Sequence, residues 1–424
     1  MIEVQVKAAL ENVTAEQIDA AAMRLKGISQ QTPLQLNRRL SRKYNAKIYL
    51  KREDLQEVRS FKIRGAYNKM ATLTEQERRQ GVVCASAGNH AQGVAFCCAL
   101  LQTRGVIFMP LTTPMQKINK VEGFGEEFVE VRLVGDTFDV ANAAARAYCE
   151  SEGAVFVHPF DDPLVIAGQG TVGKEIYEEM QGEIDIICSC VGGGGLIGGI
   201  ATYLKAHNPQ IKLLGAEPSG AASMHLALQH GRVMTIDQID PFVDGAAVAT
   251  VGQHTFRIAQ RLVDQVYTVD EGKICTQMVE LYQNEGLVVE PAGVLSLAIL
   301  DQFAHFIEGK TVVCVVSGGN NDILRYPEIM ERSLLYQGRK HYFLIKFAQK
   351  PGQLKTLVTE VLGPNDDIVR FEYVKKTNAE TGPAFVGIEL SSRDDLPPLL
   401  DRFAGSGLKY EKIESDDLLY GYLV

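Results

Sequence analysis

The stretch Val191-Gly192-Gly193-Gly194-Gly195-Leu196-Ile197-Gly198-Gly199 decides the fold class of this chain. It follows a continuous apolar run, residues 184–191, that is typical of a buried strand, and a helix-like segment comes after it. Glycines in such a turn leave consecutive backbone N–H groups free to surround an anion, and the positive end of the next helix adds attraction. The stretch therefore predicts a phosphate cradle, with a flexible turn as the alternative.

Strand-like and helix-like segments alternate on both sides of this turn. Helical spacing occurs, for example, at residues 139–149 and 164–180, and Thr14 to Gln17 has the pattern of a capping box. The alternation predicts an α/β fold with a largely parallel sheet. The apolar runs of strand length lie at residues 82–85, 106–109, 128–133, 154–157, 184–191, 211–216 and 312–316.

The pattern changes after Val316, where a polar helix-like stretch at residues 322–337 leads to Gly338. We predict a domain boundary there. The order of elements beyond it is βαββαβ, which is the ferredoxin-like arrangement of a small α+β module. The expected strands are residues 341–348, 368–374, 384–390 and 408–413, with helices after Pro351-Gly352 and after Asp394-Asp395.

Composition excludes several classes of protein. The 424 residues carry a formal net charge of −9, and no basic cluster with interleaved aromatic residues is present, which argues against nucleic acid as a partner. No apolar run of membrane-spanning length and no signal peptide is found, so we expect a cytoplasmic protein that does not bind a membrane. The eight cysteines lack Cys-x-x-Cys spacing, and we expect buried thiols and no bound metal.

Lys62 begins a helix-like segment within Ser60-Phe61-Lys62-Ile63-Arg64-Gly65-Ala66. The positive end of a helix and burial both disfavour the ammonium form, and a lowered pKa is what a Schiff-base lysine needs. An exposed lysine without a function is the plainer interpretation of this segment alone.

Two further polar segments follow predicted strands. Ser86-Ala87-Gly88-Asn89-His90 comes after residues 82–85, and Ser317 comes after residues 312–316. Open α/β sheets bind ligands at the carboxyl ends of their strands. The hydroxyl and N–H groups of the first segment suit a substrate carboxylate, and the Asn89 amide suits a phenolic oxygen. Ordinary turns with a helix cap would also explain both segments.

One alternative for the glycine stretch is a dinucleotide site. Gly193-x-Gly195-x-x-Gly198 matches that fingerprint, and Glu217 lies after the strand-like run 211–216, where a ribose-binding acid is expected. A nicotinamide dehydrogenase is therefore an alternative, but it leaves Lys62, the Ser86–His90 segment and Ser317 without a role.

Taken together, the four segments resemble the serine/threonine dehydratase branch of the fold-type II pyridoxal-phosphate enzymes, and within it the biosynthetic threonine dehydratases. The resemblance covers roughly residues 15–330. It implies two open, mostly parallel α/β subdomains in a catalytic domain of residues 1–337, with the smaller one, about residues 60–160, inserted in the larger. Residues 338–424 resemble an ACT-like regulatory domain, which implies feedback inhibition by isoleucine. The segments that carry the resemblance are residues 60–66, 86–94, 192–196 and 317–320.

The resemblance also assigns roles to single residues. Lys62 would hold pyridoxal 5'-phosphate as a Schiff base and transfer protons, Asn89 would bond the ring hydroxyl, and Ser317 would face the pyridine nitrogen. The implied reaction converts L-threonine, or also L-serine, to an oxo acid and ammonia; from threonine the product is 2-oxobutanoate. The phosphate would be bound by Gly192, Gly193, Gly194, Gly195 and Leu196, and the substrate carboxylate by Ser86, Ala87, Gly88 and Asn89.

Two departures narrow the resemblance. Serine racemases place a second serine where Ala87 stands, which disfavours racemisation here, and metal-activated relatives place an acid where Ser223 stands, which puts a cation site in doubt. The open alternatives are a broader serine/threonine dehydratase, another fold-type II lyase and a catalytically silent amino-acid sensor. We expect a homodimer or homotetramer.

Overall fold

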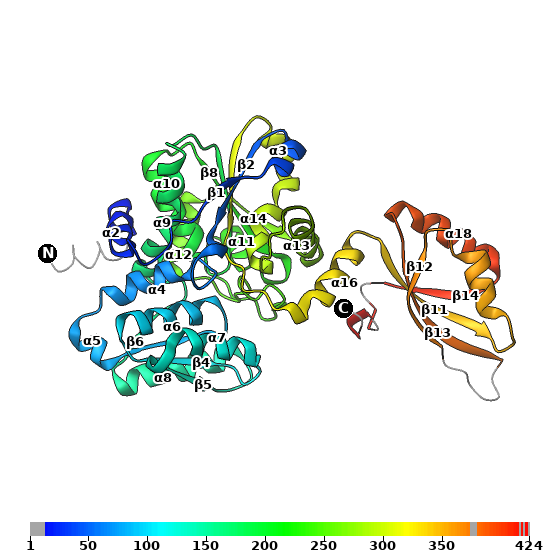
Figure 1. The fold of residues 1–424 in the computed structure, drawn as a ribbon, viewed down its shortest axis with the longest axis horizontal. Helices are drawn as coiled ribbons and strands as arrows, with labels where there is room; N and C mark the ends of the chain where they lie inside the picture. Colours follow the sequence, from blue (N-terminus) through cyan, green and yellow to red (C-terminus); the bar gives the residue numbers. More distant parts are fainter. Residues whose placement is uncertain (1–12, 374–379, 415–416, 419, 423–424) are drawn as a thin grey trace. The chain divides into compact units, whose positions relative to one another are not determined.

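The computed structural model describes residues 13–373, 380–414, 417–418 and 420–422 (Figure 1). The chain divides into two compact units. The first comprises Met1–Glu271 and Leu287–Asn321, and the second comprises Gly272–Gly286 and Asp322–Val424. All the predicted site residues belong to the first unit. The predicted domain boundary at residues 337/338 stays a prediction.

The larger sheet of the first unit has six strands in the order β1-β2-β10-β7-β8-β9. All neighbours are parallel except β1, which runs antiparallel to β2. The runs predicted at 184–191, 211–216 and 312–316 are confirmed as strands. The bounds are β1 Leu34–Leu36, β2 Lys47–Arg52, β7 Ile186–Cys190, β8 Lys212–Pro218, β9 Gln265–Val269 and β10 Thr311–Val316.

The smaller sheet is parallel and has the order β5-β4-β3-β6. Successive strand residues point to opposite faces, and both faces are buried. Cys84 and Ile107 pack on one face with residues of α4 (Lys62–Ala71), α6 (Asn89–Leu101) and α7 (Met115–Gly125), whereas Val83 and Val106 pack on the other with α8 (Phe138–Glu152). Figure 1 shows this sheet in cyan among those helices. Its strands are β3 Val82–Ala85, β4 Gly105–Met109, β5 Val129–Leu133 and β6 Val155–Phe156.

The helices of the first unit fill the sequence between these strands. The capping box at Thr14 and Gln17 is confirmed at the start of α2. Helix α9 packs against both α4 and α10, and glycines permit the close approach: a Cβ on Gly168 would lie 2.5 Å from the Arg64 carbonyl oxygen. The helices are α2 Ala15–Leu25, α3 Arg38–Tyr44, α4 Lys62–Ala71, α5 Glu75–Gln80, α6 Asn89–Leu101, α7 Met115–Gly125, α8 Phe138–Glu152, α9 Pro163–Glu179, α10 Gly195–His207, α11 Ser223–His230, α12 Gln253–Leu262, α14 Pro291–Ala298 and α15 Ala304–Ile307.

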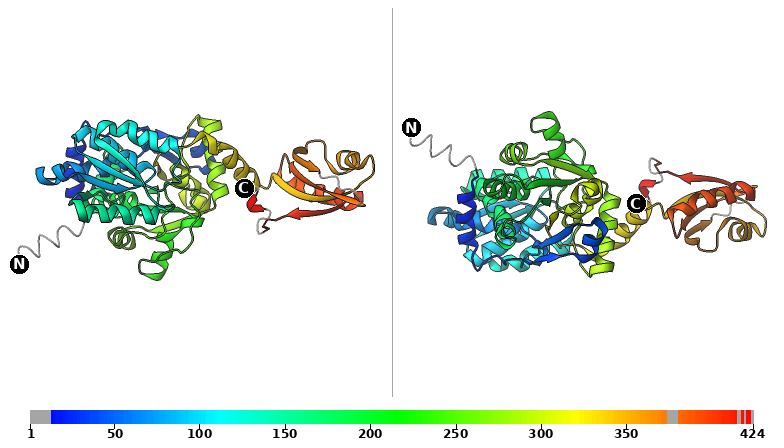
Figure 2. Two further views of the ribbon diagram at one scale, coloured as in Figure 1. Left: turned by 90° about the horizontal axis from the view of Figure 1, so that it is seen from below. Right: turned by 90° about the horizontal axis from the view of Figure 1, so that it is seen from above.

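The second unit contains an antiparallel sheet of order β12-β13-β11-β14, which confirms the ferredoxin-like prediction. The helical segment Gln353–Val361 and helix α18 (Leu396–Ser406) cover one face of the sheet, where Phe343 and Val386 pack against Leu357 and Phe403 (Figure 2). Residue 374, the end of one predicted strand, lies outside the described residues. The elements are α13 Glu271–Glu285, α16 Tyr326–Tyr336, β11 Lys340–Ala348, α17 Gln353–Thr356 with a π-helical turn Leu357–Val361, β12 Asp367–Tyr373, β13 Thr381–Glu389, α18 Leu396–Ser406 and β14 Lys409–Ile413.

None of the helices in the described part of the chain combines the length and the apolar character needed to cross a membrane.

Candidate active site

Lys62, Ser317 and the glycine turn all lie at the carboxyl ends of strands in the larger sheet. Ser317 directly follows β10, and its carbonyl oxygen accepts a hydrogen bond from the Phe61 N–H at 3.2 Å. This bond, together with a bridge between Ser60 and Gly318, places the start of α4 beside the end of β10. The segment that carries Lys62 is therefore held against the edge where open α/β sheets bind ligands.

Lys62 is the first residue of α4, as predicted. Its Nζ donates a hydrogen bond to the Pro159 carbonyl oxygen at 2.8 Å. Burial lowers the pKa of Lys62 to about 8, and the nearby Cys190 and Glu290 oppose that shift. A fraction of the amine is thus neutral at neutral pH, and the neutral amine is the nucleophilic form.

The glycine turn is a cradle that side chains would fill. A Cβ on Gly193 would lie 2.1 Å from the Phe160 ring, and Gly194 has a φ of +88°. Helix α10 begins at Gly195, so its free N–H groups end in this turn. Because Pro159 contacts Lys62 and Phe160 contacts the cradle, one dipeptide connects the amine with the predicted phosphate site.

Asn89 is held in one orientation by two neighbours. Its Nδ2 donates to Glu290 Oε1 at 2.6 Å, and its Oδ1 accepts from Asn320 Nδ2 at 2.8 Å. An amide nitrogen has two hydrogens, so one donor remains for a further partner. That donor is what a phenolic oxygen requires, and the role of Asn89 toward such an oxygen stays a prediction.

Glu290 is the main residue of this cluster that the sequence analysis missed. It is only 4% exposed, and its Oε2 accepts the Asn320 N–H at 3.1 Å. Burial raises the pKa of Glu290 to about 7, while hydrogen bonds from Asn89 and Asn320 oppose the shift. A single acid within the apolar run 287–300 was the available signal, because a buried charge requires partners.

The remaining predicted residues lie in two loops. The Ser317 hydroxyl is buried and donates to the Ala292 carbonyl oxygen at 3.2 Å, so it would have to rotate to bond a ring nitrogen. In the loop after β3, the Gly88 N–H donates to Ser86 Oγ at 3.2 Å. A Cβ on Gly88 would meet no atom within 4 Å, so this loop borders open space. Leu196 is buried in the first turn of α10.

A buried network of charges surrounds Arg64, which lies in the same helix as Lys62. The Arg64 guanidinium pairs with both oxygens of Glu53 at 2.8 Å and with both oxygens of Glu175 at 2.6 and 2.9 Å. Lys51 Nζ also donates to Glu175, at 2.6 Å. Arg64, Glu53 and Lys51 are fully buried. The network joins α4 to α9 and to β2, and thereby holds the helix that begins with Lys62.

The comparisons with known proteins agree with this geometry. Residues 26–318 match the family model described as pyridoxal-phosphate dependent enzyme. This chain is 51% identical to the biosynthetic L-threonine dehydratase of Bacillus subtilis (strain 168), in an alignment that covers 97% of this chain and 98% of the relative. The chain belongs to the biosynthetic L-threonine dehydratases. Residues 331–423 of this dehydratase match the model described as C-terminal regulatory domain of threonine dehydratase.

Two solved structures resemble the dehydratase fold. The processed form of threonine deaminase isoform 2 from Solanum lycopersicum has a TM-score of 0.72 and 39% identity, over 76% of this chain and 88% of that one. Maize serine racemase has a TM-score of 0.70 and 31% identity, over 76% and 98%. The fold-type II class predicted from the four segments is thus confirmed.

Pyridoxal 5'-phosphate is the cofactor of this dehydratase, and the residues present fit it. The Gly193 cradle at a helix start suits a phosphate, and Lys62 is a lysine with a lowered pKa. The dinucleotide alternative does not fit. Glu217 is buried, and its two oxygens accept the N–H groups of Met224 and His225 at 2.8 and 2.7 Å, which leaves the acid occupied rather than free for a ribose.

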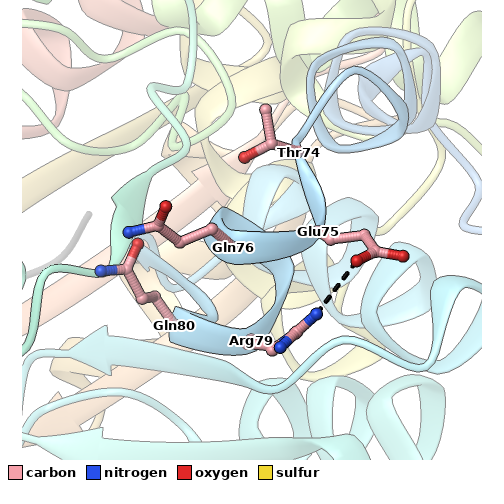
Figure 3. A pocket seen from close by; sticks show the side chains of 5 residues that line it. All are labelled: Thr74, Glu75, Gln76, Arg79 and Gln80. Carbon is pink, nitrogen blue, oxygen red and sulfur yellow. Dashed lines mark hydrogen bonds and ion pairs between the residues drawn. The ribbon is translucent and has the colours of Figure 1, made fainter.

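A separate surface hollow on α5 lies outside the dehydratase site. Figure 3 shows the five polar side chains that line it, with an ion pair of 3.0 Å between Arg79 and Glu75. The lining comes from one short, exposed helix and its cap and includes none of the predicted site residues.

His90, which follows Asn89, is held by the protein itself. Burial lowers the pKa of His90 to about 3, and its Nε2 forms a hydrogen bond with the Val157 carbonyl oxygen.

Proposed function

We propose that this chain converts L-threonine to 2-oxobutanoate and ammonia, the first step toward isoleucine. The threonine β-hydroxyl leaves as water, and hydrolysis of the resulting imine consumes one water and releases ammonia. The observation that carries the proposal is a lysine of lowered pKa, Lys62, joined through Pro159 and Phe160 to a glycine cradle, in a chain 51% identical to a named L-threonine dehydratase.

Each predicted site residue has a role in this proposal. Pyridoxal phosphate supplies the electron-withdrawing ring that makes the Cα proton of an amino acid removable. Lys62 would hold it covalently, and the Lys62 amine, once released, would move the proton at Cα. Asn89 would donate to the ring hydroxyl, and Ser317, after rotation of its hydroxyl, would bond the ring nitrogen. The phosphate would be bound by Gly192, Gly193, Gly194, Gly195 and Leu196, and the substrate carboxylate by Ser86, Ala87, Gly88 and Asn89.

Regulation and assembly complete the proposal. The match of residues 331–423 to a regulatory domain supports inhibition by isoleucine in this part of the chain. We also propose a homo-oligomer, a dimer or a tetramer, that works in the cytoplasm, as expected for a biosynthetic enzyme.

The test follows oxo-acid release from threonine and from serine by the purified full chain, with and without isoleucine. We expect turnover of threonine, loss of turnover in Lys62→Ala, and inhibition by isoleucine. Lys62→Ala should also lose the visible absorption of lysine-bound cofactor. Turnover that survives Lys62→Ala would contradict the role of Lys62, a kcat/KM higher for serine would change the substrate, and indifference to isoleucine would remove the regulatory part.

A further inference from the structure

Two lysines of helix α7 reach from the smaller sheet of the first unit to loops of the larger one. Helix α7 packs on the smaller sheet through Ile118. Lys117 Nζ lies 2.5 Å from Asp244 Oδ2, and Lys120 Nζ, one turn further along the helix, lies 3.5 Å from Asn320 Oδ1. Both contacts connect the two sheets beside the candidate active site.

The turn that carries Asp244 touches two parts of that site. A Cβ on Gly192 would lie 3.0 Å from Ala246 Cα, so the turn backs the glycine cradle. A Cβ on Gly245 would lie 3.3 Å from Glu290 Oε1. The Asp244 turn therefore lies against both the predicted phosphate site and the carboxylate of Glu290.

The Asp244 turn is anchored to the larger sheet side by its backbone and tied to the smaller sheet by a side chain. Val243 is fully buried, and its carbonyl oxygen accepts the N–H groups of Ala246 and Ala247, both at 2.8 Å. The Asp244 side chain is 39% exposed and pairs with Lys117. The ion pair with Lys117 thus connects this turn to α7.

The ion pair also acts on the charge of Glu290. Burial is the main cause of the raised pKa of Glu290, Asp244 adds to the rise, and Lys117 opposes it. Lys62 and Cys190 are further titratable groups that interact electrostatically with Glu290. Removing one partner of the ion pair at a time should therefore change the pKa of Glu290 in opposite directions.

We propose that Lys117 and Asp244 form a clasp that holds the Asp244 turn against the glycine cradle and Glu290, and thereby retains the cofactor. Both are positioning residues, because they act through Gly245, Ala246 and Glu290. A partly exposed ion pair contributes little to the stability of a fold, so its effect should be seen in the site. The proposal rests on the placement of the cofactor in the proposed function.

Charge reversal tests the clasp in the cofactor-loaded full chain. Lys117→Glu alone or Asp244→Lys alone brings two like charges together, and cofactor release should become roughly tenfold faster. The double exchange forms an ion pair in the opposite order and should restore slow release. The measurement is the loss of bound-cofactor absorption after dilution into a phosphatase that consumes free pyridoxal phosphate.

Arg104 and Glu130 provide the matched control. They form an exposed ion pair of 3.1 Å at the smaller sheet, away from the predicted site residues. Arg104→Glu should leave cofactor release unchanged, and thermal unfolding of the cofactor-free chain should shift little in every variant. Release that is equally fast in this control, or that the double exchange does not slow, would overturn the proposal.

Neutral substitutions distinguish positioning from a merely structural effect. Protonation of Glu290 removes an acceptor that orients Asn89, so cofactor affinity should fall as the pH drops through about 7. Asp244→Asn removes a negative charge near Glu290 and should move this step to lower pH. Lys117→Met leaves that negative charge unpaired and should move the step to higher pH. Shifts in the same direction, or no shift, would contradict the clasp.

Threonine turnover by the same samples separates this proposal from the proposed function, because release and affinity of the cofactor are measured without substrate. Turnover in the unmodified chain, with release unchanged by either charge reversal, would remove the clasp alone. Faster release in both reversed variants, slowed again by the double exchange, in a chain that does not convert threonine would contradict the proposed function and leave the clasp standing.

Discussion

Asn89 Nδ2 lies 2.6 Å from Glu290 Oε1, and the two residues are 201 positions apart in the chain. Glu290 accepts a second hydrogen bond from the Asn320 backbone, and Asn320 in turn donates to Asn89. Glu290 must therefore act as an acceptor on both oxygens. This requirement fixes the Asn89 amide with its remaining N–H available for the cofactor, and makes Glu290 a positioning residue.

Glu290→Gln should weaken cofactor binding. An amide has one acceptor and one donor, so either the Asn320 N–H or Asn89 loses its partner. Hydrogen bonds to charged groups contribute about 1.5–3 kcal/mol, which corresponds to roughly tenfold to a hundredfold in affinity. Titration of the cofactor-free chain with pyridoxal phosphate measures this. Glu178→Gln, which alters a surface pair with Lys174, is the matched control.

The pH profile of cofactor affinity distinguishes positioning from a merely structural effect. The pKa of Glu290 is raised to about 7, so protonation below that pH removes one acceptor. We expect affinity in the unmodified chain to fall as the pH drops through about 7. Glu290→Gln should lack that step, and a profile with the same step in both proteins would contradict the role.

Gly193→Ala should abolish cofactor binding, whereas Gly198→Ala should be tolerated. A Cβ on Gly193 would lie 2.1 Å from the Phe160 ring, but a Cβ on Gly198 would lie 3.5 Å from Ile258 in ordinary contact. Gly198 is inside α10, where alanine favours the helix by roughly 0.5–1 kcal/mol. Cofactor content and thermal unfolding of both variants provide the measurement. Full cofactor content in Gly193→Ala would show that the cradle does not depend on Gly193.

The rate at which the cofactor-free chain captures pyridoxal phosphate should rise with pH around a midpoint near 8. The neutral amine of Lys62 is the reactive form, and burial lowers the pKa of Lys62 from 10.5 to about 8. The neutral fraction therefore grows as the pH increases through this value. Stopped-flow absorption at several pH values gives the midpoint, and a midpoint near 10.5 would mean that Lys62 is not desolvated.

Arg64→Met should destabilise the first unit by about 3–5 kcal/mol, because it leaves the buried carboxylate of Glu53 without its cation. Arg79→Ala, which removes an exposed ion pair with Glu75, should cost about 0–1 kcal/mol. Denaturant unfolding of both variants compares the two. Similar losses would show that the buried network does not hold α4.

The sequence patterns located the strands and their ends but not the partners of the polar residues. Continuous apolar runs predicted β3, β7 and β10, and the residues that follow them were correctly placed at the carboxyl edge. Strand β2 was missed because Lys51 and Arg52 interrupt its apolar pattern. Their charges are compensated by Glu175 and Asp54, and the contact between Lys51 and Glu175 spans 124 positions.

The contacts of the Pro159–Phe160 dipeptide had no sequence signal either. The Phe160 ring lies against Gly193 of the glycine cradle, although the two residues are 33 positions apart in the sequence. Local patterns therefore predict which residues lie at the edge of the sheet. Long-range folding decides which of them touch.

The division of the chain into two units limits how it can be cut. The backbone passes from one unit to the other at residues 271/272, 286/287 and 321/322. One cleavage after residue 321 would detach the antiparallel sheet but leave α13 behind, separated from the remainder of its unit. A protease that nicks one exposed loop will therefore not yield two intact fragments, and exchanging the whole second unit between relatives will require replacing residues 272–286 together with everything beyond 321.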